Sequence, residues 1–199
     1  MPNECENEVS VYGSEAELKR FKEAITSKKG DGFEYQIFRN LLPIDTGTSD
    51  DPRQLAIDVW GSKWGDYDTD VSDIVVQEHG VSSLMMSYLS AWSPCDYTKI
   101  SEMFPDLTFL MIYSEHGWGF MGVTVYQKGE EVFADFADST DERYPQLREE
   151  YESEYEWQAQ DEFDEAEMNL RDEFDNSALK FVGLLPVSYT HLRAHETRE

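Results

Sequence analysis

Six side chains with binding or catalytic chemistry fall in three short segments that a β-sheet could bring together at one end. They are Asn3, Asn7, Trp92, Glu115, His116 and Trp118. If the first and third long strands lie side by side and antiparallel, the three segments meet at one edge of the sheet. The two indoles would then wall a cleft with amide, carboxyl and imidazole groups, which suits a small ligand. Glu115 beside His116 is also a candidate acid/base pair for proton transfer.

The same residues have structural interpretations. Trp92 is suited to a hydrophobic core, and the glycines at 117 and 119 to a tight turn. Asn3 and Asn7 are suited to hydrogen bonds with exposed backbone, and neighbouring side chains in a turn often point apart. The sequence therefore leaves both the ligand site and the structural role open.

A second aromatic cluster consists of Trp60, Lys63 and Trp64. It follows residues 55–60, which we interpret as a strand, so the cluster is expected at the opposite end of the sheet. The Lys63 ammonium group between two indoles could make a cation–π contact or reach an anionic partner. In the structural alternative, the indoles pack under a long loop and the lysine stem covers them.

No cofactor or metal site is predicted. Cys5 and Cys95 lack the spacing of a thiolate metal site and are expected to be reduced thiols. Four carboxylates crowd together as in a calcium loop, but Gly65 precedes them and no glutamate stands at the required final position. These four are Asp66, Asp68, Asp70 and Asp73.

The composition is strongly acidic. Asp and Glu number 42 against 16 Lys and Arg, for a formal net charge of −26. Direct nucleic-acid binding would meet long-range repulsion at every phosphate, so basic partners or cations are expected instead. The chain has no apolar run of about 18 residues and no secretion signal at residues 1–4. We therefore expect a cytoplasmic protein with no membrane segment.

Hydrophobic periodicity predicts a sheet with two helices on the first part of the chain. Alternating residues predict strands, a capping box at Ser14 and Glu17 begins the first helix, and Ser93 with Pro94 begins the second. Between them, residues 33–44 are expected to cover the domain as a lid, and residues 66–73 to form an acidic turn. The predicted strands are residues 8–13, 55–60, 83–91, 107–113, 120–127 and 132–136.

This order predicts an α+β fold over residues 1–138: a ferredoxin-like βαββαβ sandwich with an extra C-terminal hairpin strand. Residues 139–180 differ, because apolar residues three or four apart form one stripe along 141–178 while the other faces are acidic. The stripe predicts one long acidic helix, packed on the sheet or paired with a second copy as a homodimer. Residues 181–199 resemble a translated sequencing-adapter read-through and are expected to be a non-native tail.

The clearest family signal consists of five short motifs in a fixed order over roughly residues 1–136. They are Met1-Pro2-Asn3-x-Cys5-x-Asn7, Leu42-Pro43, Trp60-Gly61-Ser62-Lys63-Trp64, Ala91-Trp92-Ser93-Pro94 and Tyr113-x-Glu115-x-Gly117-x-Gly119-Phe120-x-Gly122. Together they resemble the YubB-like family, also called Api-ninety-two-like, of phage and plasmid proteins. The resemblance implies a ferredoxin-like fold without an iron–sulfur cluster, since the cysteines for one are absent. It also implies a mobile genetic element in a bacterial host, and leaves the molecular activity unsettled.

Three functions follow as hypotheses. The first is a non-enzymatic protein that binds a host or defence factor through the acidic helix or the sheet end, as in counter-defence or host takeover. The alternative is a small-ligand domain, for a nucleotide for example, with its cleft near Trp92 and Glu115. The third is an enzyme using Glu115 and His116, which the absence of phosphate-loop, zinc-helix and nucleophile-elbow motifs disfavours, so no catalytic residue is assigned.

Overall fold

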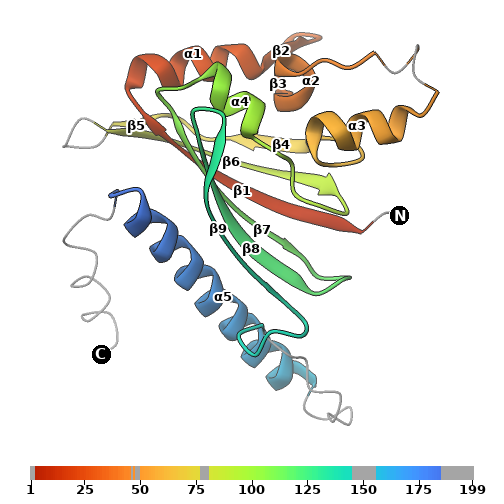
Figure 1. The fold of residues 1–199 in the computed structure, drawn as a ribbon, viewed down its shortest axis with the longest axis vertical. Helices are drawn as coiled ribbons and strands as arrows, with labels where there is room; N and C mark the ends of the chain where they lie inside the picture. The colour runs from red at the N-terminus through yellow and green to blue at the C-terminus, as the bar shows by residue number, and fades with distance from the viewer. Residues whose placement is uncertain (1–2, 46, 48–49, 77–80, 145–155, 185–199) are drawn as a thin grey trace.

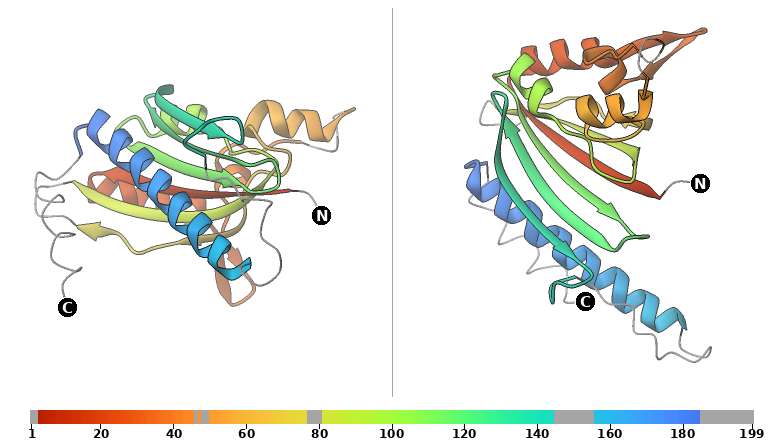
Figure 2. Two further views of the ribbon diagram at one scale, coloured as in Figure 1. Left: turned by 90° about the horizontal axis from the view of Figure 1, so that it is seen from below. Right: turned by 45° about the vertical axis from the view of Figure 1, so that its right-hand side comes forward.

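A twisted antiparallel sheet forms the centre of the molecule, with α1 to α4 on one side and α5 across the other (Figures 1 and 2). The computed structural model describes residues 3–45, 47, 50–76, 81–144 and 156–184, with the backbone alone over 156–162. The elements in chain order are β1 (Glu4–Gly13), α1 (Glu15–Ile25), β2 (Thr26–Lys29), β3 (Gly32–Tyr35), α2 (Ile37–Leu41), α3 (Pro52–Trp60), β4 (Tyr67–Val71), β5 (Val75–Val76), β6 (Ser82–Ala91), α4 (Thr98–Met103), β7 (Thr108–Glu115), β8 (Phe120–Gln127), β9 (Glu130–Asp138) and α5 (Glu156–Phe181).

The main sheet has the strand order β4-β6-β1-β7-β8-β9, and β5 also pairs with β6. Every neighbouring pair is antiparallel. The first strand of the chain is therefore central: Asn7 of β1 lies opposite Tyr88 of β6 on one side and Tyr113 of β7 on the other. This pairing confirms the mixed α/β fold with a large antiparallel sheet, and β1, β6, β7, β8 and β9 overlap five predicted strands.

Alternate residues of the strands face two separate hydrophobic cores. On β7, Phe109 and Met111 belong to the core under α1, α2 and α4, whereas Leu110 and Ile112 belong to the core under α5. This is the period of two that a strand buried on both faces requires. The first core is rich in edge-packed aromatic rings, such as Phe21 against Phe109, with centroids 5.4 Å apart.

The predicted strand at residues 55–60 is wrong, because this segment is the helix α3. The Asp51 side chain accepts hydrogen bonds from the backbone N–H groups of Arg53 and Gln54, both at 3.1 Å, and Pro52 occupies the first turn. Gly61 ends the helix in the left-handed region, with φ of 75°. These end signals decide between helix and strand for an apolar run that fits either.

The acidic turn predicted at residues 66–73 is also wrong over most of its length. Tyr67–Val71 is the edge strand β4, paired with β6. Its exposed positions are Asp68 and Asp70, while Val71 faces the core. Acidic side chains on the solvent face of an edge strand discourage pairing with other chains, so they fit a strand here.

Two further elements differ from the predictions. The helix expected from Ser93 and Pro94 begins later, at Thr98, where the Asp96 carboxylate accepts the Thr98 N–H at 2.8 Å. The Ser93 hydroxyl donates to the Gly61 carbonyl, also at 2.8 Å. The helix expected from residue 141 is wrong at its start, since Asp141 to Tyr144 form turns. Residues 145–155 of that prediction lie outside the described part of the chain, and α5 runs from Glu156.

The predicted lid at residues 33–44 consists of β3, paired with β2 as a separate hairpin, and the short helix α2. Ile37, Phe38 and Leu41 of α2 are buried in the first core. The Asp66 carboxylate fixes the start of this helix by accepting the backbone N–H groups of Ile37 and Phe38, both at 2.9 Å. The same carboxylate accepts the Thr69 hydroxyl at 2.8 Å, which ties α2 to β4.

Candidate functional site

The structure brings the three predicted site segments together at one end of the sheet. The Trp92 N–H, just after β6, donates to the carbonyl of Asn3, just before β1, at 3.0 Å. The turn between β7 and β8 closes on the same place, because a Cβ added at Gly117 would lie 2.7 Å from the Asn3 amide nitrogen. A side chain larger than glycine at this position would therefore displace the side chain of Asn3 or Glu115.

A groove of about 710 Å³ opens between these segments. Its aromatic walls are solvent-exposed: Trp118 by 73%, Trp92 by 51% and Phe136 by 48%. Trp92 also has a φ of 73°, which is rare for a bulky residue and which its hydrogen bond to Asn3 helps to hold. The groove lining comprises Asn3, Trp92, Trp118, Phe120, Phe136, Asp138 and Ser139.

Glu115 is part of the turn and is not in the groove lining. Its side chain is buried, and its two carboxylate oxygens accept the backbone N–H groups of Gly117 at 2.9 Å and Trp118 at 2.5 Å. A buried carboxylate can be stabilised by such charge-assisted hydrogen bonds. Glu115 therefore shapes the turn that presents Trp118 to solvent.

Asn7 is also a buried structural residue. Its amide group donates to the Cys5 carbonyl and to the Ser90 hydroxyl, each at 2.9 Å. The Ser90 hydroxyl in turn donates to the Ser93 carbonyl at 2.7 Å. This chain of hydrogen bonds connects β1 to the turn that carries Trp92, and it leaves Asn7 outside the groove lining.

His116 lies against α5. Its Nε2 atom is 3.7 Å from a carboxylate oxygen of Glu167. Partial burial raises the pKa of Glu167, and the nearby imidazole acts against that rise when it is protonated. Since both Glu115 oxygens are bound within the turn, the geometry gives no support to Glu115 and His116 as an acid/base pair.

The second aromatic cluster adjoins the first, so its predicted place at the opposite end of the sheet is wrong. The Lys63 ammonium group lies 5.1 Å from the Trp64 ring centroid and 4.4 Å from that of Trp92. The Ser62 hydroxyl donates to the Ala91 carbonyl and accepts the Ala91 N–H, both at 3.1 Å. Because residues 55–60 form α3 and no strand, the chain carries this cluster to the end of β6.

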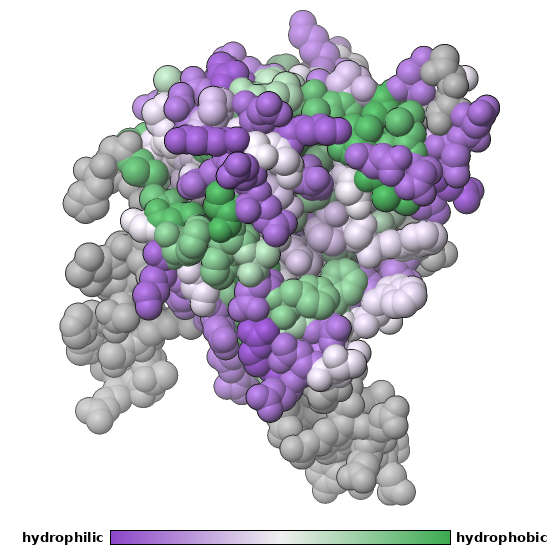
Figure 3. All heavy atoms as spheres, viewed as in Figure 1, coloured by the Kyte–Doolittle hydropathy of each residue, from purple (hydrophilic) through white to green (hydrophobic). Residues whose placement is uncertain are grey.

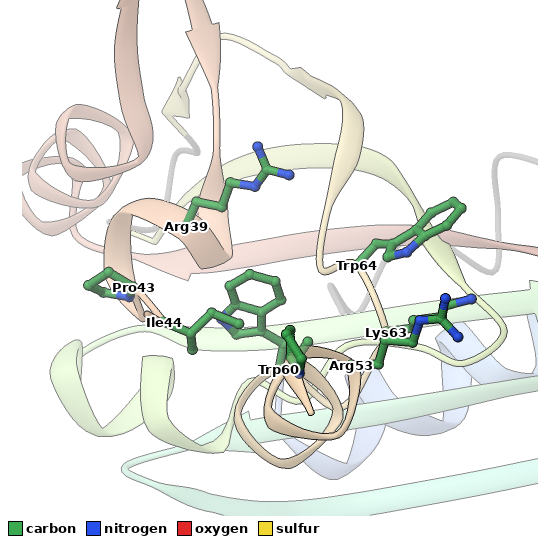
Figure 4. Close-up of a pocket in the computed structure, with 9 residues that line it drawn as sticks. Arg39, Pro43, Ile44, Arg53, Trp60, Lys63 and Trp64 are labelled. Atoms are coloured by element: carbon green, nitrogen blue, oxygen red, sulfur yellow. The ribbon is translucent and has the colours of Figure 1, made fainter. Parts of the chain in front are cut away.

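A second cavity, of about 500 Å³, lies beside α3 (Figure 4). Hydrophobic residues gather over this helix in the space-filling view (Figure 3). Trp60 is largely buried and donates its indole N–H to the Leu42 carbonyl at 2.8 Å. The cavity lining comprises Arg39, Pro43, Ile44, Pro52, Arg53, Ala56, Trp60, Lys63 and Trp64.

Arg39 and Arg53 line this second cavity but were not predicted as site residues from the sequence. The signal that could have identified Arg53 is the Asp51-Pro52 helix start, which places Arg53, Ala56 and Trp60 on one face of a helix. Nothing in the local sequence indicates Arg39, because its position depends on how α2 packs against β4.

The two thiols of the chain are expected to be unreactive in the native protein. Cys5 and Cys95 are both buried, and burial raises the pKa of Cys5 to about 12 and that of Cys95 well above its usual value. Because the thiolate is the reactive form, a disulfide reagent at pH 8 should modify neither thiol until the protein is unfolded in urea, when both should react. Rapid modification of either thiol in the native protein would contradict this assignment.

Among the residues that the structure describes, no group of three or more His, Cys, Asp and Glu side chains is placed to hold a metal ion. In the same part of the chain, no helix has both the length and the apolar character that crossing a bilayer requires.

Comparison with known proteins gives a family. A family model described as the ferredoxin-like domain in Api92-like protein matches residues 63–167. The chain also matches the crystal structure of a protein api92 from Yersinia pseudotuberculosis, with 16% sequence identity and a TM-score of 0.42, over 56% of this chain and 43% of that one. The chain thus spans less than half of that protein, and no curated protein matches it. Since the family model covers more than half of its length, the chain belongs to the family of Api92-like proteins with a ferredoxin-like domain.

Proposed function

We propose that the chain is a non-enzymatic protein of a phage or plasmid that binds a host or defence protein in the bacterial cytoplasm. The observation that carries the proposal is the exposed aromatic groove formed by Trp92, Trp118 and Phe136. Large aromatic side chains that face solvent around one groove are costly for an isolated protein. They are also the residues that most often dominate the binding energy of protein interfaces.

The charge of the chain favours a basic segment as the occupant of the groove. The net charge is −26, so a basic partner is drawn toward the protein and an acidic one is repelled. Asp138 in the groove lining adds a local negative charge, because hydrogen bonds from the hydroxyl and N–H of Thr140 lower its pKa. A partner segment with basic and apolar side chains matches the negative charge and the exposed aromatic side chains of the groove.

We also propose that residues 1–138 have the ferredoxin-like βαββαβ arrangement. The elements β1, α1, β4, β6, α4 and β7, with the sheet order β4-β6-β1-β7, support a βαββαβ unit over residues 1–138, to which β8, β9 and α5 are added. α5 packs on this sheet through Leu170, Phe174 and Ala178. A homodimer through the predicted acidic helix stays a prediction, since the structure holds one chain.

A second candidate function is the binding of a small ligand in the same groove. Its volume of about 710 Å³ lies within the range of known small-molecule sites. Trp92 lines this groove and Glu115 does not, so the indoles would make the main contacts.

The groove is tested with a matched pair of aromatic substitutions. A basic partner recovered from host lysate at low salt, identified and purified, should bind the Trp118→Ala protein about 30-fold more weakly than the wild type, as expected for a hot-spot aromatic residue. Phe33→Ala is the control, because Phe33 on β3 has the same 73% exposure but lies outside the groove. Equal affinity of the wild-type and Trp118→Ala proteins, or no partner at low salt, would refute the proposal.

A further inference from the structure

Three cations line the cavity beside α3: Arg39, Arg53 and Lys63. Within the part of the chain that the structure describes, none of them has an acidic group at ion-pair distance. Six other described Lys and Arg side chains are paired: Lys19, Arg20, Lys22, Lys29, Arg143 and Arg171. The remaining four described ones, Lys28, Lys99, Lys128 and Lys180, also have no described acidic group at ion-pair distance, but they lie outside this cavity. In a chain with 42 acidic residues, a group of unpaired cations around one cavity indicates a site for an anion.

The cavity also offers flat apolar surfaces. Figure 4 shows Arg39 on one side of the Trp60 ring and Lys63 and Trp64 on the other. Trp60 is held by its hydrogen bond to Leu42, whereas the Trp64 ring is 43% exposed. Indole rings stack on aromatic bases, and one arginine guanidinium group can donate two parallel hydrogen bonds to a phosphate group. The combination fits an aromatic ring that carries phosphate.

The backbone that carries these side chains is fixed by buried and capping hydrogen bonds. The Asp66 carboxylate holds the start of α2, on which Arg39 lies, and the Asp51 carboxylate caps α3 next to Arg53. Lys63 is held over Trp64 and Trp92. A site whose side chains start from a rigid backbone loses less conformational freedom on binding, which favours affinity.

We propose that this cavity binds a mononucleotide, with its phosphates at Arg39, Arg53 and Lys63 and its base against Trp64. The volume of about 500 Å³ suits a ligand of that size. A nucleic acid is disfavoured, because every added phosphate meets the field of a chain with net charge −26. The cavity shares no lining residue with the groove at Trp118, although Lys63 of the cavity lies over Trp92 of the groove. The mononucleotide proposal does not depend on the protein partner proposed above.

Titration of the wild-type protein tests the ligand class. ATP is added while heat and tryptophan fluorescence are recorded, in parallel with adenosine and with inorganic phosphate. We expect ATP to bind and to quench the fluorescence. Adenosine and phosphate should each bind at least about tenfold more weakly, because adenosine lacks the contacts to the cations and phosphate lacks the stacking on Trp64. Absence of ATP binding up to millimolar concentration overturns the proposal, and so does phosphate that binds as tightly as ATP.

Substitutions then test the location of the site. The Arg39→Ala/Arg53→Ala protein should bind ATP at least about tenfold more weakly. Its control is Lys28→Ala/Lys99→Ala, which has the same net charge and removes two exposed cations outside the cavity, and which should bind like the wild type. If the arginine variant is unfolded by circular dichroism, Trp64→Ala, at a half-exposed position, should show the same loss. Wild-type affinity in the folded variant overturns the assignment.

Discussion

Replacing Phe174 by alanine is expected to lower the free energy of unfolding by about 3–5 kcal/mol, the range for a fully buried aromatic residue. Phe174 has no exposed surface and lies in the core between α5 and the sheet, with Leu170 and Ala178 of the same helix. The Arg143 guanidinium group is 5.6 Å from its ring centroid, so the truncation also removes a cation–π contact. Urea unfolding followed by circular dichroism measures the loss.

The control for this prediction is Met168→Ala on the same helix. Met168 is 56% exposed, so its truncation should change the stability by less than about 0.5 kcal/mol. Hydrogen exchange gives a second readout, because release of α5 should remove protection in this helix before it does so in β1 or β6. Equal urea midpoints for Phe174→Ala and the wild type would show that α5 does not pack on the sheet in solution.

The five long strands β1, β6, β7, β8 and β9 could be predicted from the sequence because their periodicity is strong. β7 and β8 lie between two cores, so their residues are apolar on both faces, and Gly117 and Gly119 mark the turn that joins them. The antiparallel pairing of β1 with β6 then determined that the segments of Asn3 and Trp92 meet. Long-range contacts that follow from strand pairing alone could thus be predicted from the sequence.

The helix α3 and the strand β4 were predicted wrongly, and each error has a physical reason. The apolar residues of α3 fit a strand as well as a helix, and the decisive signals lay at its ends, at Asp51, Pro52 and Gly61. β4 looked like a turn because acidic residues occupy the solvent face of an edge strand. The wrong strand prediction for residues 55–60 also put Lys63 at the opposite end of the sheet from Trp92. In the structure the Lys63 ammonium group lies 4.4 Å from the Trp92 ring centroid.

The side-chain roles at the sheet end were harder to predict than its location. A sequence shows that Glu115 and Asn7 are near the turn and the strand end, but whether each faces solvent depends on the hydrogen bonds that the surrounding backbone offers. Both are buried and bonded to backbone groups, which turns two candidate ligand contacts into supports for Trp118 and Trp92. Tertiary packing therefore determines whether Glu115 and Asn7 face solvent, which the local sequence pattern does not show.

Replacing Glu115 by alanine is expected to lower the free energy of unfolding by about 3–4 kcal/mol. The change removes two part-buried hydrogen bonds to a charged acceptor, each worth about 1.5–2 kcal/mol, and leaves the N–H groups of Gly117 and Trp118 without that acceptor. Asn3 is packed against the same turn, so the groove should lose its shape together with the stability. Urea unfolding measures the first effect, and the affinity of the partner that recognises Trp118 measures the second.

The isosteric variant Glu115→Gln separates the two contributions of this side chain. Glutamine keeps one carbonyl acceptor but turns the other oxygen into a donor that faces a backbone N–H, so about half of the loss should remain. Glu130→Ala at the exposed start of β9 removes the same charge without a buried contact and should be neutral. A Glu115→Ala protein as stable as Glu130→Ala would mean that the turn holds its form without the carboxylate, and that Trp118 is presented by the glycines alone.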